Sequence, residues 1–268
     1  MEPAVLPQPR KSSSLHAIAI ELAAADQTTL PPTLGRAIHA QVMNWLSLGD
    51  SQLANAIHNS QDTPFSVSRL IGSRRKAGNK PGDKFCIRIA LLDGELIHPL
   101  LNGLEKWGTE PISLSKCPFV IREIHAMPGS HPEVSSSDYY LLFKTSKVSD
   151  DITLEFLSPT SFKQKQYVQP FPLPEFVFGS LLRRWNAFAP EAVQLPSVMW
   201  QGLVSSYELK THALKMEGGA EIGSVGWVRY RFPDREQARI ATTLAHFAAF
   251  AGVGRKTGMG MGQTRLIS

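Results

Sequence analysis

Apolar and polar residues follow two different periods along residues 15–124. Some stretches alternate residue by residue, which is typical of strands that bury one face. Others repeat every three or four residues, which is typical of amphipathic helices. In chain order these periods predict a strand, a helix, a short helix capped by Asp50, two strands, a helix and an extended segment, at residues 15–22, 34–48, 50–58, 65–71, 85–92, 96–107 and 112–124.

A second series of elements follows residues 128–138, a stretch of low hydrophobicity that we interpret as a linker. The same order of strand, helix, two strands, helix and strand is predicted at residues 151–157, 175–188, 204–216, 220–232, 234–250 and 263–267. Glu217, Gly218 and Gly219 are typical of a hairpin turn between the two long strands. This βαββαβ order in both halves predicts an α+β protein with two tandem ferredoxin-like, RRM-like domains at residues 1–135 and 136–268.

Composition limits the class of protein. Apolar residues make up 43% of the chain, so a packed core is expected, and no run of 18 apolar residues predicts a membrane span. The amino-terminal segment lacks the apolar region of a signal peptide, which favours a cytoplasmic protein. The net charge of +5 favours a polyanionic partner. Cys86 and Cys117 form no C-x-x-C pair, and we expect no metal site and no cofactor.

Residues 252–263 contain five glycines together with Arg255 and Lys256. Successive backbone amides in such a loop can form an anion-binding nest. A phosphate-binding loop requires G-x-x-x-x-G-K-[ST] before a helix, and a dinucleotide fingerprint requires an early strand before it. This loop follows a helix and precedes the last strand, so both nucleotide-binding interpretations fail. The alternative to a nest is a hairpin that packs the last strand.

Three segments together resemble the CRISPR repeat-processing endoribonucleases of the RAMP superfamily. The first is the glycine-rich GVGRKTGMGMGQTR near the carboxyl end. The second is the pair LEFLSPTSF and FGSLLRRWN in the middle, and the third is LGRAIHAQVMNWL with LANAIHNSQDTPFSVSRL near the amino end. The resemblance covers nearly the whole chain.

The resemblance implies two tandem ferredoxin-like domains and metal-independent cleavage of precursor CRISPR RNA within the repeat, usually at the base of a stem-loop. The products would carry a 2′,3′-cyclic phosphate and a 5′-hydroxyl. The partner would be the repeat RNA, with subunits of a CRISPR effector complex as further partners. The alternatives are a non-catalytic repeat-binding subunit of such a complex and a general RNA-binding module.

His58 is the first candidate for proton transfer, because it ends the second helix, where the helix dipole favours an imidazolium, and its context is similar to that of the family's histidine. His39 is the second candidate and Arg36, one helical turn earlier, is expected to bind phosphate. The alternatives are a capping histidine, a structural histidine and a solvated charge. Some family members have a tyrosine where this chain has Met43, and Tyr207 is one residue that could replace it.

Further RNA contacts are expected from cations and from the loop glycines, because phosphate contacts supply affinity. The predicted residues are Arg69, Arg74, Arg75, Lys76, Lys80, Arg183, Arg184, Arg229, Arg231, Gly254, Arg255, Lys256, Gly258 and Gly260. The alternative for the basic segment at residues 69–88 is a solvated loop.

Overall fold

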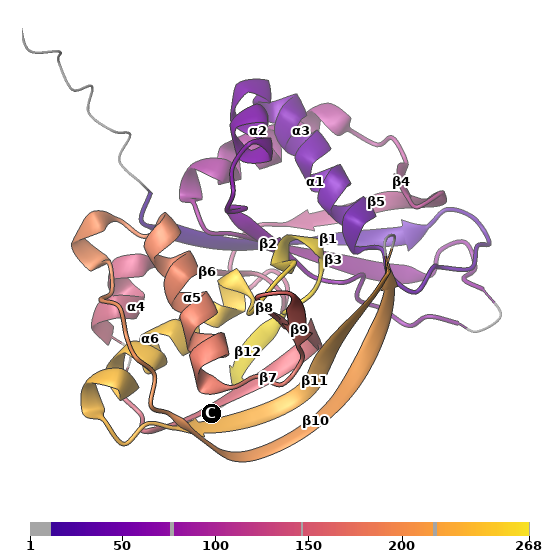
Figure 1. Ribbon diagram of the computed structural model, residues 1–268. Helices are drawn as coiled ribbons and strands as arrows, with labels where there is room; N and C mark the ends of the chain where they lie inside the picture. Colours follow the sequence, from indigo (N-terminus) through magenta and orange to yellow (C-terminus); the bar gives the residue numbers. More distant parts are fainter. Residues whose placement is uncertain (1–11, 76–77, 146, 217–218, 268) are drawn as a thin grey trace, which may run out of the picture.

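The computed structural model describes residues 12–75, 78–145, 147–216 and 219–267 as two antiparallel sheets with helices on their faces (Figure 1). The strands are β1 (Ser14–Ala24), β2 (Phe65–Val67), β3 (Lys84–Leu91), β4 (Ile112–Leu114), β5 (Cys117–His125), β6 (Ser135–Asp138), β7 (Asp151–Thr160), β8 (Phe162–Gln164), β9 (Tyr167–Gln169), β10 (Leu203–Met216), β11 (Gly219–Arg231) and β12 (Thr264–Ile267). The helices are α1 (Gly35–Gly49), α2 (Ser51–His58), α3 (Ile97–Trp107), α4 (Tyr139–Thr145), α5 (Pro174–Phe188) and α6 (Arg235–Ala251), with short 3₁₀ turns η1 (Gly94–Leu96), η2 (Glu191–Val193) and η3 (Thr257–Met259). No helix among the described residues combines the length and the apolar character that crossing a bilayer requires.

The first sheet has the strand order β2-β3-β1-β5-β4, and β6 also pairs with β1. Alternation along β1 directs Ile18, Ile20 and Leu22 to one face, where they share a core with Trp45 of α1 and Leu100 of α3. These buried contacts hold α1 against this face of the sheet.

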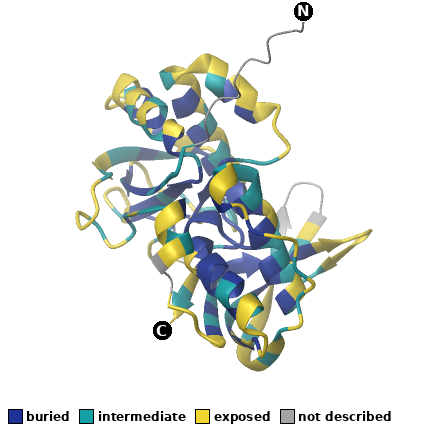
Figure 2. Ribbon diagram, turned by 90° about the vertical axis from the view of Figure 1, so that its left-hand side faces the viewer, coloured by how far each residue is buried: buried dark blue, intermediate teal, exposed yellow. Residues whose placement is uncertain are grey.

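The second sheet has the strand order β10-β11-β7-β12 and packs against α5 and α6. Its core is aromatic: Phe178 of α5 makes edge contacts with Tyr230 and Phe232, and Trp185 packs edge-on to Phe247 of α6. Figure 2 shows buried residues in the strands and on the inner sides of the helices in both halves.

The opposite face of β1 joins the two halves. Leu15 and Ala17 belong to the same buried cluster as the aromatic residues of the second half. The carboxyl end of α6 also lies against the first sheet, because the Ser66 hydroxyl donates to the Phe250 carbonyl over 2.6 Å and Arg88 Nη1 donates to the Ala249 carbonyl over 2.8 Å. These bonds satisfy terminal carbonyls that a helix leaves unpaired. They direct the segment after α6 toward the first half.

The structure confirms the predicted order of strands and helices, with three differences. The interpreted linker contains β6, whose residues Ser135 to Asp138 pair with β1 and so extend the first sheet. The extended segment at residues 112–124 is two strands, separated by a turn in which Ser115 and Lys116 have positive φ. The sequence patterns missed α4 and the small β8–β9 hairpin. The predicted hairpin turn lies at residues 217–218, outside the described residues.

Candidate active site at the glycine-rich loop

The glycine-rich loop at residues 252–263 leaves α6 and returns as β12. At its base the Val253 amide donates to the Gly262 carbonyl over 2.8 Å, and the Gly254 amide donates to Ser180 Oγ over 3.1 Å. Gly254 and Gly260 have φ of 80° and 81°, a region that glycine occupies without steric cost. The loop is therefore anchored at its base to the second half, while its tip, η3, contacts α1 and β2 of the first half.

The tip of the loop approaches α1 closely. A Cβ atom placed on Gly35 would lie 1.8 Å from the carbonyl oxygen of Met259. Only glycine fits at this position without displacing one of the two backbones. The first turn of α1 and the loop therefore form a single surface.

His39 faces the loop from the second turn of α1. Its Nδ1 lies 2.9 Å from the Gly258 carbonyl oxygen, and its ring stacks on Phe65 of β2 with centroids 5.4 Å apart. A carbonyl only accepts, so Nδ1 carries the proton in the neutral ring and Nε2 keeps its lone pair. Burial lowers the pKa of His39, the bond to Gly258 opposes this shift, and the charge of His58 lowers the pKa further. This arrangement favours a neutral imidazole that can accept a proton.

His58 is the exposed last residue of α2. That helix begins where Asp50 Oδ1 accepts from the Leu53 amide over 2.9 Å, as the sequence predicted. The charge of His58 lowers the pKa of His39, so the two imidazoles interact electrostatically. Of the two predicted histidines, His39 is the one that contacts the loop.

Arg36 is exposed in the first turn of α1, one turn before His39. The first turn of the helix has no acidic residue, and the Gly35 amide donates to Thr33 Oγ1 over 3.4 Å. The positive end of the helix dipole therefore meets no carboxylate of its own first turn. Arg36, His39 and the amino end of α1 thus offer cationic and hydrogen-bonding groups along one edge.

Two arginines of α5 hold the segment between His58 and β2. Arg183 forms an ion pair with Asp62, and Arg184 Nη2 lies 3.4 Å from the Thr63 carbonyl. Arg184 is only 5% exposed, and burial lowers its pKa to about 10. Its guanidinium therefore faces the protein interior, although the sequence suggested an RNA contact.

A cleft of about 690 Å³ lies beside the loop, between the two halves. Gly35, Arg69 and Arg74 line it from the first half, and His212 and Arg265 line it from the second. The Met259–Gly260 step of the loop forms part of its wall. Two of the predicted RNA-binding cations, Arg69 and Arg74, therefore line one cleft together with Arg265.

The other predicted cations lie outside this cleft. Arg255 Nη1 and Lys256 Nζ both contact Glu221, at 3.1 and 2.5 Å. Arg75 pairs with Asp83, and Arg231 pairs with Asp151. Arg229 lines a separate hollow together with His246, and Lys80 is exposed on the surface. Lys76 lies outside the described residues.

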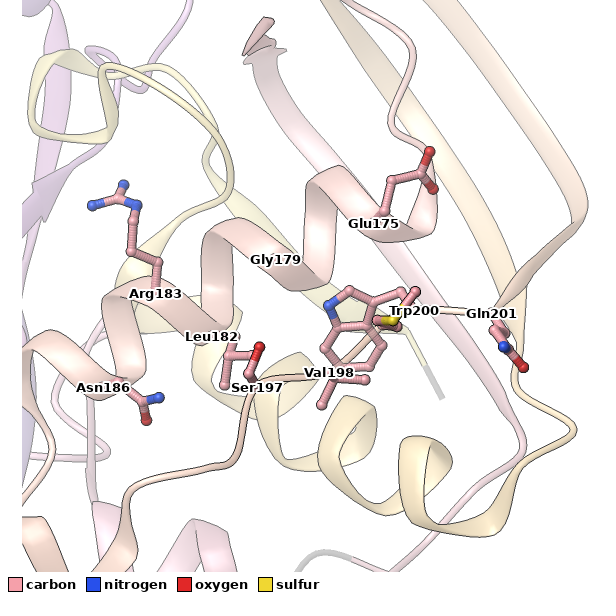
Figure 3. A pocket seen from close by; sticks show the side chains of 10 residues that line it. Glu175, Gly179, Leu182, Arg183, Asn186, Ser197, Val198, Trp200 and Gln201 are labelled. Carbon is pink, nitrogen blue, oxygen red and sulfur yellow. The ribbon is translucent and has the colours of Figure 1, made fainter.

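A further hollow lies beside α5 (Figure 3). Glu175, Gly179 and Arg183 line it from the helix, and the extended residues 197–201 line it from the other side, with the indole of Trp200 between them. None of the predicted histidines lines this hollow, so it is separate from the loop.

Met43 and Tyr207, the two residues considered for the tyrosine of some family members, lie on different elements, α1 and β10. Met43 packs at the edge of the first core, and Tyr207 is exposed on β10, where its ring makes an edge contact with Phe171.

Sequence patterns did not select Phe65 as a stacking partner, Glu221 as a counter-ion or Arg265 as a cleft residue. The partners of these residues lie far away in the chain: Phe65 stacks on His39, Glu221 pairs with Arg255 and Arg265 pairs with Glu155.

Comparisons with known proteins point to one family. The family model for the CRISPR-associated endoribonuclease Cas6 matches residues 154–264. A search of curated proteins finds no match.

Solved structures of two Cas6 proteins align with nearly the whole chain. One, a Cas6 product complex, has 28% identity and a TM-score of 0.74 over 95% of this chain and 100% of its own. The same Cas6 has been solved as a substrate mimic complex, with 28% identity and a TM-score of 0.71. It has also been solved as a histidine-to-alanine mutant, with 27% identity and a TM-score of 0.73. Both alignments cover 96% of this chain and 100% of the other. A Thermus thermophilus Cas6 in a product complex has 23% identity and a TM-score of 0.80, over 96% of this chain and 100% of its own. At this identity the comparison shows that the two proteins share a fold.

Proposed function

We propose that this chain is an endoribonuclease of the Cas6 family, as the match to the family model and to solved Cas6 structures suggests. In this proposal it cuts precursor CRISPR RNA within the repeat without a metal ion. In the proposed reaction, a ribose 2′-hydroxyl attacks the adjacent 3′-phosphate. The products are a 2′,3′-cyclic phosphate and a 5′-hydroxyl. The observation that carries the proposal is the imidazole of His39, hydrogen-bonded to the glycine-rich loop through Nδ1.

The nucleophile belongs to the RNA, so the protein must orient it, move two protons and stabilise the phosphorane. Nε2 of His39 takes the proton of the 2′-hydroxyl as the new oxygen–phosphorus bond forms. A lowered pKa keeps this ring neutral at physiological pH, which a general base requires. Sequence alone favoured His58 for proton transfer; the contacts of His39 favour it as the base.

His58 supplies the second proton. It donates to the 5′-oxygen as the bond between that oxygen and phosphorus breaks. As the exposed last residue of α2, it is accessible to a bound RNA strand. In this proposal His39 and His58 act on the attacking and the leaving oxygen of the same phosphate, as base and acid.

Arg36 and the amino end of α1 stabilise the negative charge that grows on the phosphate. A guanidinium presents a fork of donors that matches two phosphate oxygens. The cleft with Arg69, Arg74 and Arg265 carries the adjoining RNA backbone. Phosphate contacts of this kind position a strand, while unpaired bases and stem shape supply specificity.

Each sheet with its helices is proposed to be one ferredoxin-like unit. In both sheets the second strand of the unit pairs with the third, the third with the first and the first with the fourth. The two units share the buried face of β1, so they act as one RNA-binding body rather than as independent modules.

The main alternative is a non-catalytic subunit that binds repeat RNA. The Cas6 with 28% identity has been solved as a product complex and as a substrate mimic complex, which favours the enzyme. Incubation of the purified protein with end-labelled repeat RNA in the presence of a chelator separates the two functions. We expect one cut within the repeat. Binding with no cut, in chelator or with added divalent ions, would support the non-catalytic function.

A further inference from the structure

A group of two carboxylates and two imidazoles lies on the face of the first sheet opposite α1. The register of β1 with β5 places Glu21 opposite Glu123 and Ala19 opposite His125. A β-bulge near Glu21 shifts this register, and bulges commonly redirect side chains. His131, from the segment between β5 and β6, stacks on His125 with ring centroids 5.1 Å apart.

Three atoms of this group converge on one point. His125 Nε2 lies 3.6 Å from Glu21 Oε1 and 3.7 Å from Glu123 Oε2. One carboxylate or imidazole atom from each of these residues lies within 4.8 Å of the other two. Two ligands at about 2.1 Å from one ion, separated by a tetrahedral angle, lie about 3.4 Å apart. The two distances from His125 Nε2, 3.6 and 3.7 Å, are close to that value.

The His125 side chain is 10% exposed, and its Nε2 is buried without a hydrogen-bond partner in the described part of the chain. A buried polar atom without a partner costs free energy. The two carboxylates add a second cost, because like charges opposite each other on paired strands repel. A cation at the point of convergence would remove both costs.

His131 lies beside one of the carboxylates. Its Nδ1 accepts from the Glu133 amide over 3.1 Å, so its Nε2 carries the proton in the neutral ring. That Nε2 lies 3.9 Å from Glu21 Oε1, too far for a hydrogen bond, so His131 does not satisfy this carboxylate.

We propose that Glu21, Glu123 and His125 bind one Zn²⁺-like divalent cation, with a fourth position open to solvent beside the exposed Glu123. One imidazole nitrogen and two carboxylate oxygens suit zinc and similar transition ions. The ion joins β1 to β5 and has a structural role. It lies on the face of the sheet opposite the one against which α1 packs, so RNA cleavage does not depend on it.

The test uses the full chain without an affinity tag, stripped with a chelator and then dialysed. Isothermal titration with zinc chloride, together with metal analysis after gel filtration, is expected to give one bound ion per chain. Thermal unfolding with zinc is expected at a higher Tm, since an ion that binds only the folded state stabilises it.

Variants identify the site. His125→Gln and Glu123→Gln are each expected to weaken zinc binding about tenfold or more. Glu123 is 66% exposed, so its variant retains the fold even where the buried His125→Gln does not. His98→Gln and Glu105→Gln, at exposed positions on α3, are the matched controls and keep full affinity. The proposal is overturned when the wild type binds no zinc or when Glu123→Gln leaves binding unchanged.

Discussion

A single hydrogen bond sets the chemistry of His39. Sequence placed this residue at the edge of the apolar face of a helix, one turn after Arg36, and so made it a candidate. The carbonyl that fixes its tautomer belongs to Gly258, 219 residues away. No local pattern could reveal this contact, and the strongest local signal, a histidine at a helix end, pointed to His58 instead.

His39→Ala is expected to slow single-turnover cleavage by about 10²–10⁴-fold, the usual contribution of a general base. Repeat RNA binding should stay within a few fold, because the phosphate contacts remain. His98→Ala, at an exposed position on α3, is the control and should cut normally. If His39→Ala cuts like the wild type while His58→Ala does not, the assignment of the base to His39 is wrong.

The pH profile of cleavage follows from the lowered pKa of His39. A base must be neutral, so the rate falls as the pH drops through the pKa of His39. That midpoint should lie below the ordinary histidine value of about 6.5. His58→Gln removes the neighbouring positive charge, so the pKa of His39 should rise and the midpoint should move to higher pH. Residual single-turnover rates of this variant measure the shift, and a midpoint that stays or falls contradicts the proposed coupling.

At the scale of elements, the glycine-rich loop and α1 depend on each other. The sequence showed that the loop needs positive φ and close approach, but not which element it approaches. The carboxyl end of α6 docks on the first sheet through Ser66 and Arg88, and this contact delivers the loop tip to α1. The partner of the loop is therefore decided by packing between the halves.

Gly35→Ala tests that dependence. The added methyl group would lie 1.8 Å from the Met259 carbonyl oxygen, so the loop tip or α1 must move, and the bond from His39 to Gly258 is disturbed. We expect cleavage to fall at least tenfold in a protein that is still folded by circular dichroism, since misplacement of about 1 Å can cost 10²-fold. Gly179→Ala, whose new Cβ would meet nothing within 4 Å, should cut normally. Normal cleavage by Gly35→Ala would mean that the contact is not needed.

At the scale of the whole molecule, hydrophobic periods predicted most strands and helices and the order in which they follow. They could not show that β1 is buried on both faces, because Leu15 and Ala17 pack into the core of the other half. The sequence of Ser135 to Asp138 indicated a linker because these residues are polar, although they form a strand that pairs with β1. The sequence predicted no metal site. It could not bring Glu21, Glu123 and His125 together, because only the register of β1 with β5 does so.

The cleft between the halves should carry part of the electrostatic affinity for RNA. Arg69→Ala is expected to reduce the steepness of log Kd against log salt by about one, the change for one lost phosphate contact. Arg231→Ala is the matched control, because this exposed arginine pairs with Asp151 outside the cleft. Equal slopes for Arg69→Ala and the wild type would place the RNA backbone elsewhere.

The most direct test of the proposed mechanism replaces one atom of the substrate. A repeat RNA with a single deoxyribose at the nucleotide before the cut keeps its shape and charge but lacks the attacking oxygen. We expect this RNA to bind like the unmodified repeat and to remain uncut, while the unmodified repeat is cut in chelator and yields a 2′,3′-cyclic phosphate. Cleavage of the deoxy substrate at the same position, or a 5′-phosphate on the downstream product, would contradict it.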